Sequence, residues 1–173
     1  MSPEFLAEYR SRMLAVWEEK SLFFVLYADS VQLGFNDLDA QTLGRLGLPS
    51  WAAPNIWLHP PKKLLDRYLN LGEDSNDREI RYDTHTGRVF VNDVTGELLV
   101  ALSVLDFLTL LLEFAEMIEK SIALCGADAY SNGRIPRYLI SKFLQKVEAR
   151  LGTNGAKESM WGPELDQLSR NSC

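Results

Sequence analysis

The chain has 173 residues, of which 46% are hydrophobic and 24% are charged, and these are the proportions of a folded globular protein. A formal net charge of −6 repels the phosphate backbone, so the composition argues against direct nucleic-acid binding. The most apolar stretch, residues 98–112, is interrupted by Ser103 and Asp106 and is shorter than the ~20 apolar residues that a bilayer-spanning helix needs.

The N-terminal part predicts a long helix followed by shorter elements. A serine and a proline are typical of a helix start, and apolar residues then recur every three or four positions, so residues 3–20 are expected to form an amphipathic helix. The run 22–27 is short and β-prone, which favours a buried strand. Asn36 and its neighbours offer capping oxygens to a short helix over 40–47, which a glycine ends.

The middle of the chain predicts a β-meander. Residues 55–59 form either a strand or an irregular segment ended by Pro60 and Pro61, because proline denies donors to a sheet. Turn dipeptides at Thr86-Gly87 and Thr95-Gly96 separate apolar runs that alternate with polar neighbours, as in hairpins with one solvated face. The expected strands are 68–71, 79–83, 88–91 and 97–101.

The C-terminal part predicts helices that support this sheet. Ser103 and Asp106 resemble a capping box that opens a helix to about residue 124, and this helix is apolar on most sides. A second helix is expected from Pro136 to Gly152, followed by a flexible connection over 152–157 and a terminal segment that Trp161 pins to the body.

The expected fold is therefore a single α+β domain over residues 1–173, in which an antiparallel or mixed sheet packs against helices. It divides into an N-terminal helix over 3–20, a strand-rich part over 22–101 and a helical part over 103–170.

The sequence contains few residue patterns that indicate catalysis. The two histidines, His59 and His85, stand in no recognisable triad, and no phosphate loop, dinucleotide fingerprint or zinc spacing occurs. The strongest candidate is Glu79, Asp83 and His85, which could bind a divalent metal or share acid–base work. An ordinary polar hairpin is the favoured interpretation, so no catalytic residue, metal or cofactor is expected.

The cysteines and the chain start bear on the compartment. Cys125 and Cys173 are too few for a disulfide framework, which favours a reducing compartment. The first residues lack a cationic leader followed by an apolar core, so a secretory signal is not expected and the predicted location is the cytoplasm.

Two features are candidates for contact with a partner. The first is expected at the surface, and the second is expected to be partly exposed. An acidic run could steer a basic partner, with a merely solvated loop as the favoured alternative. Trp51 and Trp57 flank an Ala-Ala-Pro turn and would suit an interface, although aromatic side chains also fill cores, and we expect one of the two to be buried. The acidic residues are Glu73, Asp74, Asp77, Glu79 and Asp83, relieved by Arg78 and Arg81.

A succession of short motifs resembles the SUKH (Smi1/Knr4-like) superfamily, most closely the bacterial SUKH-4 immunity proteins. The motifs are LGRLGLP at 43–49, Leu71-Gly72, EIRYD at 79–83, GRVF at 87–90, Asp93 with Gly96, the helix start at 103–114, and Trp161 with Leu165 and Leu168. They cover residues ~36 to 170 in order. The N-terminal helix and the Pro60-Pro61 segment have no counterpart in this pattern, and the Gly-Gly element of other branches is missing.

The resemblance implies a cytoplasmic antidote that binds a polymorphic bacterial toxin and occludes its active site, with no catalytic residues of its own. The acidic charge would suit a basic toxin such as a nuclease. Two alternatives stay open: a regulatory interaction module of the Smi1/Knr4 type, and a metal-dependent hydrolase that uses Glu79, Asp83 and His85.

Overall fold

A six-stranded antiparallel sheet lies at the centre of the protein. The computed structural model describes residues 1–94 and 96–171, so the expectations on Thr95 and Cys173 fall outside the described residues. The strands are β3 (Trp51–Ala52), β4 (Ile56–Lys63), β5 (Tyr68–Asp74), β6 (Glu79–Asp83), β7 (Val89–Asp93) and β8 (Gly96–Ala101). Their order in space equals their order in the chain, which confirms the predicted meander and the α+β class.

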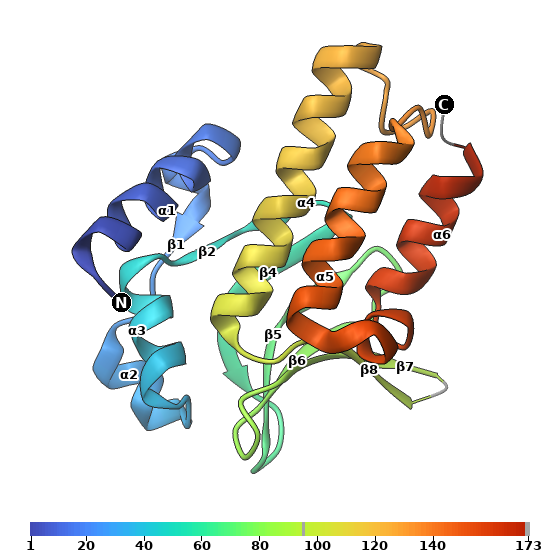
Figure 1. Cartoon of the computed structure of the whole chain (residues 1–173). Helices are drawn as coiled ribbons and strands as arrows, with labels where there is room; N and C mark the ends of the chain where they lie inside the picture. Colours follow the sequence, from blue (N-terminus) through green and yellow to red (C-terminus); the bar gives the residue numbers. More distant parts are fainter. Residues whose placement is uncertain (95, 172–173) are drawn as a thin grey trace.

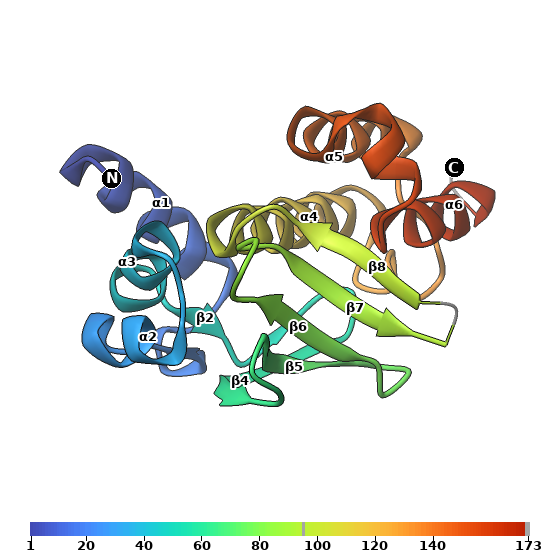
Figure 2. The same cartoon turned by 90° about the horizontal axis from the view of Figure 1, so that it is seen from below.

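Three long helices cover one face of this sheet. They are α4 (Val104–Cys125), α5 (Arg137–Lys157) and α6 (Trp161–Asn171). Figure 2 shows them on the same side of the strands, and no helix of residues 1–94 or 96–171 lies against the opposite side. The side chains that alternate toward the helices form the core, among them Ile80, Tyr82, Val89 and Val91, all 0% exposed. One face of the sheet is therefore buried, and the other is open.

The N-terminal elements pack beside the sheet as a separate cluster (Figure 1). They are α1 (Pro3–Val16), the 3₁₀ turn η1 (Glu19–Ser21), β1 (Leu22–Phe23), α2 (Tyr27–Leu33), α3 (Asp37–Arg45) and β2 (Leu48–Pro49), with β1 and β2 pairing as a small sheet. The predicted strand over 22–27 is wrong beyond Phe23, because the backbone turns into α2 at Tyr27. The predicted helix over 3–20 ends four residues early, where Trp17 caps it in an extended conformation.

A buried carboxylate connects this cluster to the rest of the molecule. Asp39 on α3 accepts hydrogen bonds from the backbone N–H of Val104 at 2.8 Å and from the Tyr82 hydroxyl at 2.9 Å. Asn36, the residue that caps α3, donates to the same carboxylate at 2.6 Å. Burial raises the pKa of Asp39, and these donors oppose the rise. One side chain thus joins α3, β6 and the start of α4.

The C-terminal helices follow the prediction at their starts. The Ser103 hydroxyl accepts a hydrogen bond from the N–H of Asp106, so the predicted cap of α4 is confirmed. The predicted flexible connection over 152–157 is wrong, because the chain leaves helical geometry only at Gly152, with φ 75°, and is helical again up to Lys157. Ala156 in this segment is buried, so packing orders it.

The two edges of the sheet differ. At one edge, the short strand β3 pairs with β4 at only two positions, and farther along β4 contains Pro60 and Pro61, where its pairing with β5 shifts register between Leu58 and Lys62. The prolines lie at this irregularity inside β4, so the prediction that they end the segment is wrong. At the other edge, the N–H of Met160 and the indole N–H of Trp161 donate to the carbonyls of Leu99 and Val100 on β8. The confirmed role of Trp161 is to hold α6 against this edge.

Candidate protein-binding surface

The open face of the sheet carries a cross-strand row of two tryptophans and two glutamates. Trp51 on β3 lies opposite Trp57 on β4, and Trp57 lies opposite Glu73 on β5. Glu73 in turn lies opposite Glu79 on β6. Directly opposed residues in an antiparallel pair project to the same face, with their Cβ atoms about 4.5–5.5 Å apart. Four of the predicted partner-binding residues are therefore neighbours on one surface.

The direction of this row follows from the side chains that flank it. Ile56 and Leu58, on either side of Trp57, are 0% and 5% exposed and point into the core. Because successive side chains of a strand point to opposite faces, Trp57 points outward. Trp51 and Trp57 are 46% and 45% exposed. The expectation that one of them is buried is wrong, because their direct pairing places both on the same side.

A second row beside the first contains residues that sequence reasoning did not select. Asn70, Arg81, Phe90 and Leu99 oppose one another across β5 to β8. The guanidinium of Arg81 lies 5.9 Å from the centre of the Tyr68 ring and bonds Glu79 through two nitrogens, at 2.9 and 2.6 Å. The signal that could have identified Arg81 was its position between the core residues Ile80 and Tyr82.

Asp74 belongs to a turn and not to this surface. Its side chain is only 5% exposed, and it accepts hydrogen bonds from the N–H groups of Asn76 and Arg78 and from the Arg78 guanidinium. Arg78 also bonds Asp93, at 2.7 Å. The prediction that Asp74 lies at the surface is wrong, because its carboxylate satisfies the donors of the β5–β6 turn.

Asp83 is likewise buried, at 1% exposed. It accepts hydrogen bonds from Nε and Nη2 of Arg67, at 2.9 and 2.6 Å, and from the Thr86 hydroxyl and the His85 N–H. The Arg67 guanidinium holds the pKa of Asp83 well below its usual range. This carboxylate fixes the β6–β7 turn, so its predicted surface position is wrong.

The Asp83→Asn variant is expected to be less stable than the wild type by about 1–2 kcal/mol at neutral pH, since it loses charge-assisted hydrogen bonds to a half-exposed arginine. A depressed carboxyl pKa stabilises the fold above the unfolded pKa of about 3.9 and loses that contribution as pH falls toward the folded value. Urea unfolding at pH 7 and pH 3 should therefore show the difference shrinking at low pH. A difference that stays constant would contradict this.

The other predicted partner-binding residues, Asp77, Glu73 and Glu79, occupy different positions. Asp77 is exposed in the β5–β6 turn at φ 56°, away from the tryptophan row, whereas Glu73 is exposed within it. Glu79, half-buried, is held by Arg81. Of the seven predicted residues, the structure thus brings together Trp51, Trp57, Glu73 and Glu79.

The catalytic alternative has little geometric support. Asp83 is engaged by Arg67 and Glu79 by Arg81. In the described part of the chain, no group of three or more His, Cys, Asp or Glu side chains is placed to hold a metal ion.

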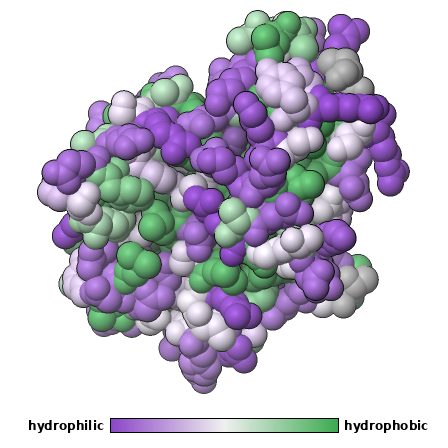
Figure 3. All heavy atoms as spheres, in the orientation of Figure 1, coloured by the Kyte–Doolittle hydropathy of each residue, from purple (hydrophilic) through white to green (hydrophobic). Residues whose placement is uncertain are grey.

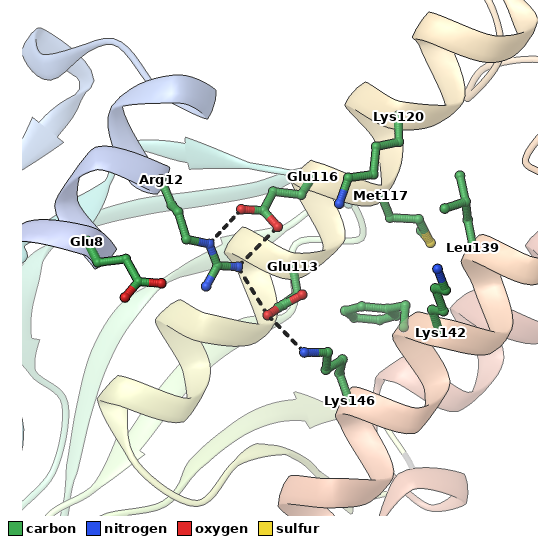
Figure 4. A pocket seen from close by; sticks show the side chains of 10 residues that line it. Glu8, Arg12, Glu113, Glu116, Met117, Lys120, Leu139, Lys142 and Lys146 are labelled. Carbon is green, nitrogen blue, oxygen red and sulfur yellow. Dashed lines mark hydrogen bonds and ion pairs between the residues drawn. The ribbon is translucent and has the colours of Figure 1, made fainter. Parts of the chain in front are cut away.

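A charged cleft of about 380 Å³ lies on the other side of the molecule, between α1, α4 and α5. Figure 4 shows Arg12 reaching from α1 to the carboxylates of Glu116 and Glu113 on α4, at 2.9 and 3.1 Å. Lys146 on α5 approaches Glu113 from the other wall, at 3.6 Å. Arg12, Glu113, Glu116 and Lys146 therefore form ion pairs across this seam between packed helices.

The face of the molecule shown in Figure 3, in the same orientation as Figure 1, is mainly hydrophilic, and its hydrophobic side chains lie in separate spots. In residues 1–94 and 96–171, no helix is long and apolar enough to cross a bilayer.

Comparison of the chain with family models, with curated proteins and with solved structures finds no match.

Proposed function

We propose that this chain is a stoichiometric protein inhibitor, an immunity protein that neutralises a bacterial toxin by occluding it with the open face of the sheet. The observation that carries the proposal is the row formed by Trp51, Trp57, Glu73 and Glu79 on a sheet face that no helix covers. The chain has no catalytic role in this proposal, and its location is the cytoplasm.

The composition of the open face suits a protein interface. Tryptophan, tyrosine and arginine are the side chains most enriched at binding hot spots, and Trp51, Trp57, Tyr68 and Arg81 lie on or beside the two rows. The tryptophans project from paired strands, so binding orders their side chains and not the backbone that carries them. An aromatic patch on a backbone fixed in this way supports binding.

Charge supports a basic partner. The chain carries a formal net charge of −6, and both glutamates of the row belong to the same face as the tryptophans. An acidic inhibitor associates quickly with a basic protein because long-range attraction steers the encounter. The toxin is accordingly proposed to be basic, with a nuclease as the leading class. The resemblance to SUKH immunity proteins agrees with this role.

The proposal is tested by co-expressing the chain with the product of the adjacent gene and scoring growth, followed by co-purification. We expect the neighbouring gene to be toxic alone, and growth to recover together with a stable one-to-one complex. A harmless neighbour that does not bind would overturn the immunity role. The Smi1/Knr4-type regulatory module would then become the leading interpretation of the same surface.

A further inference from the structure

We propose that Trp57 and Glu73 form a receptor for an arginine side chain of the partner. The inference rests on the proposed function, since it names the chemical group that the open sheet face recognises.

Glu73 is the carboxylate of the row whose negative charge is not neutralised by any described residue. Its neighbour Glu79 binds the Arg81 guanidinium through two nitrogens, so that negative charge is already neutralised. Glu73 lies exposed on the sheet without a hydrogen bond or an ion pair to any described residue. Because Arg81 neutralises Glu79, Glu73 keeps the uncompensated negative charge of the row. A cation from outside would neutralise it.

The tryptophan beside Glu73 supplies the second half of the receptor. The indole of Trp57 is 45% exposed, and it makes no ring contact or cation–π contact within the described part of the chain. An exposed tryptophan face attracts a cation within about 6 Å of its centre. With Glu73 directly opposite, one group can stack on the indole and donate hydrogen bonds to the carboxylate at the same time.

Arginine satisfies both contacts better than lysine. Its guanidinium is planar, stacks on aromatic faces and donates two parallel hydrogen bonds to a carboxylate, whereas the lysine ammonium acts as a compact, strongly hydrated charge. The protein itself already uses this combination at Tyr68, where Arg81 lies against the ring and bonds Glu79, and Arg67 lies against the same ring and bonds Asp83. Trp57 and Glu73 repeat the arrangement with the cation left for the partner.

The experiment titrates the full chain with the peptide acetyl-Arg-Arg-Arg-Arg-amide at low ionic strength and follows tryptophan fluorescence. Trp17 and Trp161 are 6% and 0% exposed, so a change in emission reports mainly on Trp51 and Trp57. We expect saturable binding of the arginine peptide, weaker binding of the tetra-lysine peptide by about 3-fold or more, and none of tetra-glutamate.

Glu73→Gln should weaken binding of the arginine peptide by about 5- to 10-fold, while the unfolding midpoint in urea stays the same, because the substitution removes no contact within the protein. Asp77→Asn is the matched control, because it removes the same charge from a nearby exposed position, and it should change binding by less than about 2-fold. Equal losses in the two variants, or equal affinity for arginine and lysine peptides, would overturn the proposal. Binding of the arginine peptide is independent of the co-expression result, so failure of the immunity role and failure of the arginine receptor are told apart.

Discussion

Replacing Trp57 with alanine is expected to weaken the complex with the protein partner by about 100-fold, because a central tryptophan anchor is worth roughly 2–4 kcal/mol of binding free energy. The variant should remain folded, since the indole is 45% exposed and the core residues beside it, Ile56 and Leu58, are unchanged. The measurement is isothermal titration of each variant with the co-purified partner, alongside circular dichroism.

The matched control for this experiment is Tyr138→Ala. Tyr138 is 52% exposed on α5, on the helical side of the molecule, so its loss removes an exposed aromatic ring of similar size away from the open face. It should leave the affinity within about 2-fold of wild type. If the two variants weakened the complex equally, or if only the tyrosine variant did, the partner would not bind the sheet face.

Replacing Trp161 with alanine is expected to lower the free energy of unfolding by about 3–5 kcal/mol. The indole is 0% exposed, and its ring centre lies 5.9 Å from that of Phe114 and 5.4 Å from that of Phe143. Its N–H also donates to the Val100 carbonyl at 2.9 Å. Alanine therefore removes an aromatic contact to two helices and a hydrogen bond to the sheet edge.

Trp161→Phe separates these two contributions. Phenylalanine keeps most of the ring packing and leaves the Val100 carbonyl without its donor, so a smaller loss of about 1–2 kcal/mol is expected. Urea unfolding monitored by far-ultraviolet circular dichroism measures both variants. An alanine variant within 1 kcal/mol of wild type would show that α6 is not held by this side chain.

The meander was predictable because its signal is local. Ile80, Tyr82, Val89 and Val91 alternate with polar neighbours, and glycine turns separate the strands, so pattern and turn chemistry agree. The cap of α4 was predictable for the same reason, since Ser103 and Asp106 are three residues apart.

The predictions that were wrong concern segments whose structure depends on tertiary contacts. The helix α2 starts at Tyr27 without a side-chain cap, so β-prone residues before it dominated the local pattern. The prolines of β4 are tolerated because the register with β5 shifts around them, which only the partner strand reveals. The burial of Asp74 and Asp83 depends on Arg78 and Arg67 closing around them, and a run of charges does not show which of its acids have such partners.

The site was partly predictable. Trp51 and Trp57 were selected as candidates, but their common face follows from the turn between β3 and β4, which pairs them directly. With Trp51 paired to Trp57, both side chains must lie on one face of the sheet, and Glu73 lies on the same face across the next strand. The role of Arg81 on this surface could not be predicted, because it depends on the ion pair with Glu79, which only the structure shows.

In the proposed role, the alternation of the sheet assigns recognition and packing to alternate residues of the same strand. On β4 and β6, positions such as Trp57 and Arg81 project outward, while Ile56, Leu58 and Ile80 maintain the fold. Substitutions at every second position can therefore change what the surface recognises without disturbing the packing beneath. A lineage that must follow a diversifying partner could retune its specificity quickly on such a scaffold, while its architecture stays constant.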